Sequence, residues 1–218
     1  MNCNNSSGGV IQVFCKAPVP GKVKTRLIPE LGAEGAARLH AHLANSTFTK
    51  ISERMTGVAE LWCAPDTSDP FFQEAGETHD FSLHEQHGKD LGERMAFALC
   101  QAVEKYQWAI LIGTDCPELH AGIIDEAKRK LEGGEEIVFG PAADGGFYLV
   151  GLRRYPQGLF SNMQWGDENV MKEIEARLER SALSCCMLDT LNDLDRPEDL
   201  ARFPELMQQT GIKNYELD

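Results

Sequence analysis

Short apolar runs alternate with longer amphipathic segments along most of the chain. The apolar runs are four to six residues long and rich in β-branched residues, which is typical of buried strands. They lie at 10–15, 58–63, 81–86, 108–113, 136–140, 147–152 and 185–188. The amphipathic segments carry apolar side chains three to five residues apart, a spacing that predicts helices. These helices are expected at 33–55, 91–106, 123–131 and 167–180, and a last one begins at Pro197.

Strands that alternate with helices predict a mostly parallel sheet with helices on both faces. No linker, repeat or low-complexity segment interrupts the pattern, and 218 residues suit one domain. We therefore expect a single α/β domain over residues 10–218, built as an α/β/α sandwich. The segment 1–9, MNCNNSSGG, is small and polar and predicts a frayed N-terminus.

The overall charge narrows the choice of partners. The chain has 34 acidic against 21 basic side chains and a formal net charge of −13. This balance disfavours nucleic acid as a partner, because phosphate backbones attract basic surfaces. No apolar run approaches the roughly 20 residues of a membrane-spanning helix, and the first residues lack the pattern of a secretory signal. We expect a cytoplasmic protein without a membrane span.

A basic loop follows the first predicted strand. It reads KAPVPGKVKTRL from Lys16 to Leu27, with four cationic side chains in its first eleven residues. In parallel α/β sheets, ligands bind beyond the carboxyl ends of the strands, and Lys, Arg and backbone N–H groups there suit a polyphosphate. The loop matches neither the Walker motif nor the dinucleotide-binding glycine pattern. The alternative is a solvated run of charge. The candidate nucleotide- and phosphate-binding residues are Lys16, Gly21, Lys24, Thr25 and Arg26.

Carboxylates follow three later predicted strands. Asp115 stands in GTDCP, Asp144 in GPAADGGF, and Asp193 and Asp195 in DTLNDLDRP. A carboxylate at the carboxyl end of a strand is placed to hold a divalent ion that bridges phosphates. We expect Asp115 and Asp195 to share one Mg²⁺ or Mn²⁺, with Asp193 as the alternative second ligand. For each of these acids, a role in a turn or a helix cap remains open.

Further candidates lie beside these acids. The glycines after Asp144 permit positive φ and a close approach to a ligand, although Asp-Gly is also the commonest hairpin signal. Trp165 either covers an acceptor or anchors the core. Cys116 has no paired histidine that would activate it as a nucleophile, and the histidines contribute no predicted site. The candidate substrate- or acceptor-binding residues are Asp144, Gly145, Gly146 and Trp165.

Four segments carry a family resemblance: KAPVPGKVKTRL, GTDCP, GPAADGGFYLVGL and DLDRPEDL. In this order, over about residues 10–203, the chain resembles the radical-SAM/selenodomain-associated transferase family, a branch of the nucleotide-diphospho-sugar transferases. It is more distantly similar to phospholactate guanylyltransferase and the molybdenum-cofactor nucleotidyltransferases. The resemblance implies a glycosyltransferase-A-like fold, a nucleotide over the first loop and Mg²⁺ or Mn²⁺ near Asp115. It also implies catalytic roles for Asp115, Asp144 and Asp195.

One feature departs from the metal-dependent glycosyltransferases of this fold, which usually carry an Asp-x-Asp pair. Here Asp115 is followed by Cys116 and Pro117, and this single Asp with Pro looks more like the nucleotidyltransferases. The leading hypothesis is therefore a metal-dependent transferase that uses a nucleotide-activated donor and a small-molecule acceptor. Either a nucleotidyl group is transferred and pyrophosphate leaves, or a sugar is transferred and a nucleoside diphosphate leaves. A nucleotide-binding module without turnover is the alternative, and the sequence leaves the oligomeric state open.

Overall fold

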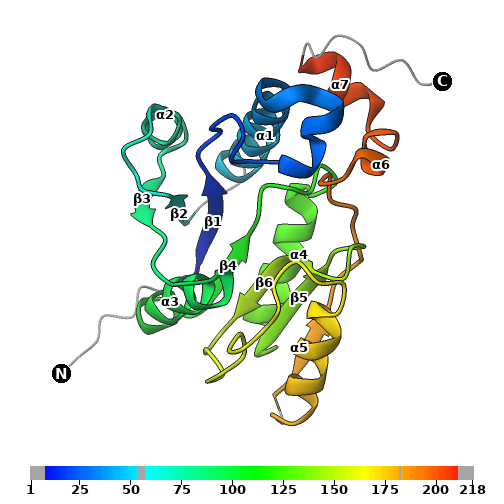
Figure 1. The fold of residues 1–218 in the computed structure, drawn as a ribbon. Coiled ribbons are helices and arrows are strands. Elements are labelled where there is room, and N and C mark those ends of the chain that lie inside the picture. Colours follow the sequence, from blue (N-terminus) through cyan, green and yellow to red (C-terminus); the bar gives the residue numbers. More distant parts are fainter. Residues whose placement is uncertain (1–7, 54–56, 182, 211–218) are drawn as a thin grey trace.

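The computed structural model describes residues 8–53, 57–181 and 183–210 (Figure 1). At its centre lies a seven-stranded sheet with the order β3-β2-β1-β4-β6-β5-β7. Neighbouring strands in this sheet are parallel except where β6 pairs with β4 and with β5. The strands are β1 (Val10–Lys16), β2 (Val58–Ala64), β3 (Ser82–Glu85), β4 (Ala109–Ile112), β5 (Ile137–Pro141), β6 (Phe147–Leu152) and β7 (Cys185–Met187). The mostly parallel sheet predicted from the sequence is confirmed, and each predicted strand end lies within one residue of the observed one.

The helices cover both faces of the sheet. They are α1 (Ile28–Ser52), α2 (Pro70–His79), α3 (Leu91–Lys105), α4 (Ala121–Glu132), α5 (Val170–Glu179), α6 (Pro197–Leu200) and α7 (Pro204–Gln209), with a 3-10 turn η1 (Thr25–Leu27) before α1. In α1, Gly32 has the non-helical φ of 68°, so the regular helix begins after it, where the sequence predicted its start. The sequence did not predict α2.

Successive side chains along each strand point to opposite faces of the sheet, so the hydrophobic core lies on both faces. In β1, Ile11 and Val13 pack with α1, α2 and α4, whereas Val10 and Phe14 pack with α3 and α5 on the opposite face. Successive side chains of a strand point to opposite faces, so a strand buried on both sides reads as a continuous apolar run. A third apolar cluster joins η1 and α1 to α6 and α7.

The strand directions bring four loops to one edge of the sheet. β1, β4, β5 and β7 all run the same way, so their carboxyl ends meet there, and in Figure 1 the arrows of β1 and β4 both point toward α1. Because β6 runs in the opposite direction, the loop between β5 and β6 also lies at this edge. The four candidate segments named from the sequence therefore converge.

The predicted frayed segment 1–9 lies largely outside the described residues, which begin at Gly8. The Gly8 carbonyl accepts a hydrogen bond from the Gln107 amide at 3.0 Å. Gly9 packs so closely on Trp108 that a Cβ added there would lie 2.0 Å from the indole ring. Among the helices of the described residues, none has the length and apolar character needed to cross a membrane.

Candidate active site

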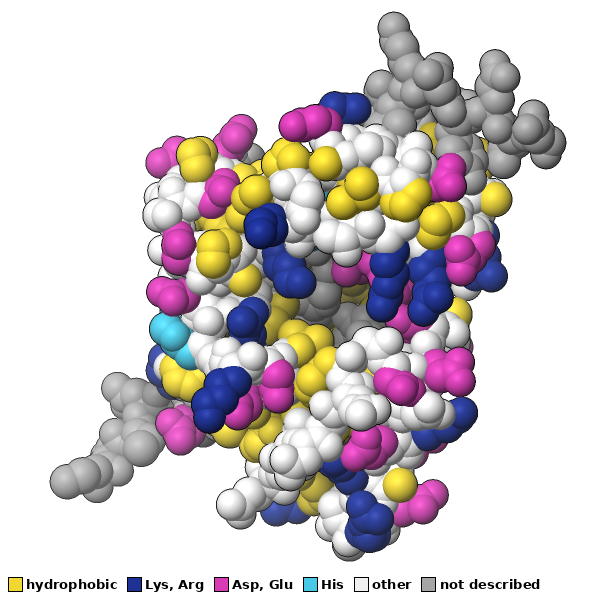
Figure 2. Space-filling view, viewed as in Figure 1, with side chains coloured by type: hydrophobic (Ala, Val, Ile, Leu, Met, Phe, Trp, Pro, Cys, Tyr) yellow, Lys and Arg dark blue, Asp and Glu magenta, His cyan; other side chains and the backbone are white. Residues whose placement is uncertain are grey.

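A cleft of about 670 Å³ opens where these loops meet. Figure 2 shows this face of the molecule hollowed at its centre, with Lys and Arg side chains on both sides of the hollow. Its walls include the loop after β1, the start of α3, the loops after β4, β5 and β7, and the segment before α5. The predicted site residues that line it are Lys16, Lys24, Thr25, Arg26, Asp115, Asp144, Gly146, Trp165, Asp193 and Asp195. Gly21 and Gly145 are not among its lining residues.

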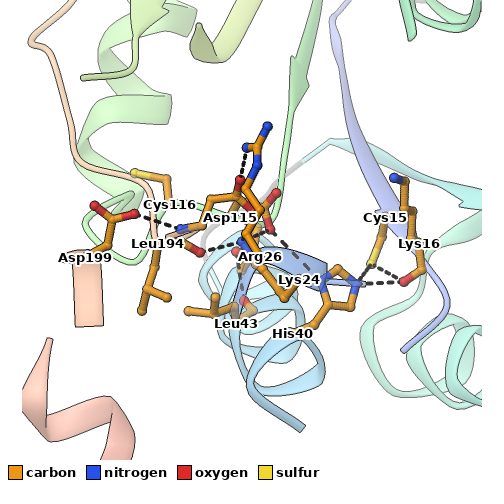
Figure 3. Close-up of polar contacts among 12 residues, drawn as sticks. Cys15, Lys16, Lys24, Arg26, His40, Leu43, Asp115, Cys116, Leu194 and Asp199 are labelled. Atoms are coloured by element: carbon orange, nitrogen blue, oxygen red, sulfur yellow. Dashed lines mark hydrogen bonds and ion pairs between the residues drawn. The ribbon is translucent and has the colours of Figure 1, made fainter. Parts of the chain in front are cut away.

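A buried lysine lies at the centre of the site (Figure 3). The Lys24 side chain is 2% exposed, and its Nζ donates to the Leu194 carbonyl at 2.5 Å and to Asp115 Oδ1 at 2.7 Å. The same nitrogen lies 3.7 Å from Asp195 Oδ1. The Lys24 backbone has a φ of 46° in the left-handed region, where a residue with a Cβ is disfavoured by about 1–2 kcal/mol. Carboxylates that follow two different strands thus meet at one ammonium group.

Asp195 also binds a second cation. Arg26 Nη1 lies 2.5 Å from Asp195 Oδ2, and half of the Arg26 side-chain surface is exposed. Asp195 does not cap α6, which was the alternative interpretation. The capping residue is Arg196, whose amide donates to the Asp199 carboxylate at 2.8 Å. The two acids of the centre are therefore balanced by two basic side chains.

Asp115 is ionised at neutral pH. Its side chain is 52% exposed, because it faces the open cleft. Protein surrounds it on the other sides, at the floor of the cleft. Burial in these surroundings raises its pKa, but the Lys24 ammonium lowers it more, and His40 and Lys16 lower it further. The net result is a pKa below the ordinary value of an aspartate.

The sequence predicted a divalent ion shared by Asp115 and Asp195. The residues at this place do not fit such an ion. The two carboxylates do converge, but the Lys24 ammonium occupies the position between them. No cluster of three or more His, Cys, Asp or Glu side chains suited to a metal occurs within the described ranges. Asp193, the alternative ligand, lines the same cleft, and burial together with the charge of Asp144 raises its pKa to about 6.

The Asp-Gly-Gly loop is shaped by contacts within the protein. Asp144 Oδ1 accepts a hydrogen bond from the Gly146 amide at 2.8 Å, and its side chain is exposed at the cleft. Gly145 has a φ of 91°, and a Cβ there would lie 2.0 Å from the Glu168 carbonyl oxygen. The predicted close approach at Gly145 is thus made to the backbone before α5. It holds the loop that presents Asp144.

Two side chains flagged in the sequence have clear structural surroundings. Trp165 lines the cleft and packs against Phe147 and Phe160, with ring centroids 6.4 and 5.9 Å away. Cys116 is buried and its Sγ donates to the Asn192 carbonyl at 3.4 Å. Burial raises the Cys116 pKa to about 11, so the group is a thiol at neutral pH. Trp165 therefore both anchors the core and faces the cleft, and Cys116 lines the cleft as a buried thiol bonded to the loop after β7.

Sequence reasoning missed His40 and Gln86, which line the cleft. His40 Nε2 lies 2.8 Å from the Lys16 carbonyl and therefore carries the proton of the neutral ring, because a carbonyl only accepts. Its Nδ1 then faces Asp115 Oδ1 at 4.0 Å, and burial lowers the His40 pKa. Gln86 Nε2 donates to the Trp62 carbonyl at 2.8 Å. The only signal for His40 was a polar residue on the apolar face of a helix.

Comparison with solved structures defines the class of fold. The chain is similar to a protein from Desulfovibrio desulfuricans G20 that is provisionally assigned as a nucleotide-diphospho-sugar transferase, with a TM-score of 0.80, 27% identity, and coverage of 97% of this chain and 100% of that one. The inositol-1-phosphate CTP transferase from T. maritima gives a TM-score of 0.60 at 11% identity, covering 96% and 98% of the two chains. Glucosyl-3-phosphoglycerate synthase from Mycobacterium tuberculosis gives 0.51 at 13% identity, covering 95% and 82%. The chain has the nucleotide-diphospho-sugar transferase fold, as predicted.

The family follows from the sequence itself. Residues 47–167, more than half of the chain, match the model of a family of uncharacterized proteins conserved in bacteria (DUF2064), and the chain belongs to this family. A comparison with curated proteins gave no match. Of the structural neighbours, one is described as a CTP transferase, and another is described in complex with Mn²⁺, UDP and glucosyl-3-phosphoglycerate.

Proposed function

We propose that this protein transfers a group from a nucleotide-activated donor to a small-molecule acceptor bound in the cleft. The observation that carries the proposal is the meeting, in one cleft, of the basic loop after β1 and the carboxylates that follow β4, β5 and β7. A polyphosphate requires cations, and an attacking hydroxyl requires a proton acceptor. Two proteins of this fold support the proposal: one is described as a CTP transferase, and the other in complex with UDP and glucosyl-3-phosphoglycerate.

The phosphates of the donor lie against the basic loop in this proposal. Lys16 is exposed, and Arg26 uses Nη1 for Asp195, which leaves its other guanidinium nitrogens for a ligand. These two side chains neutralise the charge that develops on the leaving phosphates. Gly21, with a φ of 79°, and Thr25 shape the loop that carries them. The candidate Lys24 does not contact phosphate, because protein oxygens surround its ammonium group.

The acceptor lies on the side of Asp144, Gly146 and Trp165. Trp165 and Phe147 supply an apolar wall, and the Asp144 carboxylate is exposed to accept a hydrogen bond from an acceptor hydroxyl. Asp193 has its pKa raised to about 6 by burial and by the charge of Asp144. A carboxylate with a pKa near the operating pH suits general-base catalysis, so Asp193 takes the hydroxyl proton as the acceptor attacks.

Two reactions are compatible with this arrangement. In nucleotidyl transfer, the acceptor oxygen attacks the α-phosphorus, the bond to the bridging oxygen breaks and pyrophosphate leaves. In glycosyl transfer, the acceptor oxygen attacks the anomeric carbon and a nucleoside diphosphate leaves. The single Asp115 before Cys116 and Pro117 favours nucleotidyl transfer. Membership of the radical-SAM/selenodomain-associated transferases and dependence on Mg²⁺ or Mn²⁺ stay predictions from the sequence.

A thermal-shift screen tests the proposal. Nucleoside mono-, di- and triphosphates and nucleotide-sugars are added in the presence of EDTA or of Mn²⁺, and hits are assayed with acceptor mixtures for pyrophosphate and nucleoside diphosphate. We expect stabilisation by at least one donor and release of one of the two products. Absence of nucleotide binding in every condition refutes the proposal. Binding without any product across all donors and acceptors favours the nucleotide-binding module instead.

Arg26→Ala locates the phosphates within the cleft. A charge-assisted hydrogen bond contributes about 1.5–3 kcal/mol, so we expect the variant to bind the best triphosphate about 10–150-fold more weakly. The matched control is Arg153→Ala, because Arg153 is exposed and follows the carboxyl end of β6, at the opposite edge of the sheet. An equal loss for the monophosphate would restrict the contact to the α-phosphate. An unchanged affinity would indicate that the basic loop is a solvated run of charge and does not bind phosphate through Arg26.

A further inference from the structure

Lys24 occupies the place that the sequence assigns to a divalent ion. Its Nζ donates to Asp115 Oδ1 after β4 and to the Leu194 carbonyl after β7, at 2.7 and 2.5 Å (Figure 3). It also lies 3.7 Å from Asp195 Oδ1. An ammonium group has three donors and no acceptor. Two of these donors have close oxygen partners in Asp115 and Leu194, and Asp195 at 3.7 Å adds an ion-pair contact without a hydrogen bond. A divalent cation in the same place would draw on the same carboxylates, since oxygen is the ligand that Mg²⁺ prefers.

The four side chains joined by these ion pairs carry no net charge together. Asp115 and Asp195 bring two negative charges, and Lys24 and Arg26 bring two positive ones. A divalent ion at the same carboxylates would add two positive charges beside a buried ammonium group. Coulomb repulsion between such close cations opposes the added ion, although water in the open cleft screens the side of Asp115 that is exposed. The centre therefore favours the ammonium group over an added ion.

The lysine is also held in place by its own loop. Its side chain is 2% exposed, so leaving the site would mean withdrawing a buried charge through packed surroundings. The Lys24 carbonyl accepts a hydrogen bond from the Leu27 amide at 2.9 Å, which closes the turn at η1. Buried Val23 and Leu27 flank this turn. The position of the ammonium group is thus built into the folded loop.

We propose that Lys24 is a built-in cation that takes the place of a divalent ion at Asp115 and Asp195, so that the cleft binds the phosphates of its donor without a metal. Lys24 is a positioning residue in this arrangement. It fixes the loops after β4 and β7, while Lys16 and Arg26 contact the phosphates. The statement about phosphates rests on the proposed function, whereas the statement about the cation does not.

Titration with Mn²⁺ alone, followed by electron paramagnetic resonance, tests whether Lys24 takes the place of a divalent ion at Asp115 and Asp195. Lys24→Met keeps the length of the side chain and the strain of the left-handed backbone but removes the charge. We expect this variant to bind Mn²⁺ at least about tenfold more tightly than the wild type, because two carboxylates lose their internal cation. Lys22→Met, which removes an exposed lysine of the same loop, is the matched control and is expected to behave as the wild type.

Two further outcomes make the test decisive. Adding Asp195→Asn to Lys24→Met is expected to abolish the gained Mn²⁺ binding. A folded Lys24→Met protein that binds Mn²⁺ no more tightly than the wild type overturns the proposal.

A measurement on the wild type decides the question should Lys24→Met fail to fold. The nucleoside diphosphate that stabilises the protein most is titrated by calorimetry in excess EDTA and in excess Mg²⁺. We expect the two dissociation constants to differ by less than about tenfold, which corresponds to about 1.4 kcal/mol. A larger loss in EDTA overturns the proposal. If no nucleoside diphosphate binds in either condition, the proposed function fails, and the Mn²⁺ titration of the wild type still decides the cation statement.

Discussion

Replacing Asp115 by Asn tests whether its pair with Lys24 holds the site together. Asparagine preserves the shape of the side chain and one acceptor oxygen, so the change removes charge rather than volume. Lys24 would keep the Leu194 carbonyl at 2.5 Å and the Asp195 carboxylate at 3.7 Å, but lose the charged oxygen at 2.7 Å. A buried ammonium group would then be only partly compensated.

Two limits bracket the expected cost. Breaking a fully buried ion pair costs about 3–5 kcal/mol, and a hydrogen bond to a charged group contributes about 1.5–3 kcal/mol. Asp115 is 52% exposed, so water screens it, and Asp195 retains part of the compensation. We therefore expect the free energy of unfolding to fall by about 1.5–2.5 kcal/mol at pH 7.

The sign of the pH dependence follows from the pKa of Asp115. Although burial opposes it, Lys24 lowers the Asp115 pKa below its unfolded value of about 3.9. The stabilisation is then fully present above that unfolded value and is lost as the pH falls through the lower folded value. The difference in unfolding free energy between wild type and Asp115→Asn should be constant from neutral pH to about pH 5 and shrink below about pH 4.

Urea denaturation at pH 7 measures this difference, with Asp144→Asn as the control. The control makes the same substitution in the same cleft, at an exposed acid whose bond to the Gly146 amide an asparagine can also form. We expect it to cost no stability, because an asparagine keeps this bond and its neutral side chain no longer repels Asp193. Should Asp115→Asn cost no more than this control, the pair with Lys24 does not stabilise the fold and the reasoning fails.

Three further substitutions test the surroundings of the cleft. Gly145→Ala is expected to destabilise the protein by about 3 kcal/mol or more, because its Cβ would lie 2.0 Å from the Glu168 carbonyl oxygen at a φ of 91°. Urea denaturation measures the loss, and an effect no larger than that of Gly146→Ala would contradict this expectation. Cys116→Ala should leave nucleotide binding unchanged, and wild-type Cys116 should resist iodoacetamide at pH 7 in peptide mapping, since burial raises its pKa to about 11; rapid labelling would mark a reactive thiolate. Asp193→Asn should raise the unfolding free energy by about 1–2 kcal/mol at pH 7 but little at pH 4. The reason is that burial and a neighbouring carboxylate raise the Asp193 pKa to about 6, so that the charged form destabilises the folded protein. An equal effect at both pH values would exclude titration as the cause.

The fold was largely predictable because both of its periodic signals are strong. Strands such as Ala109–Ile112 are buried on both faces and appear in the sequence as unbroken apolar runs. The helix Pro70–His79 was missed because only Phe72 and Ala75 of its ten residues are buried, too few to mark an apolar stripe. Its start was nonetheless signalled, since Asp69 caps it through the Phe71 amide and Pro70 occupies its first turn.

The site was predictable to the level of the sheet edge but not to the level of atoms. Parallel strands place Asp115 and Asp195 at the same edge of the sheet, where their carboxylates lie 2.7 and 3.7 Å from the Lys24 ammonium group. What the sequence could not supply is the direction of Lys24, which depends on a left-handed backbone that no local pattern required. From the sequence, a lysine in a basic loop of an acidic protein is expected to be available to a ligand. A buried lysine, however, is stable only when it is paired. The carboxylates that pair with Lys24 are the ones that the sequence assigned to a metal, Asp115 and Asp195. Their approach to one another at the sheet edge therefore explains both the predicted ion site and the burial of Lys24. Distance and burial, rather than residue type, decide which cation these carboxylates hold.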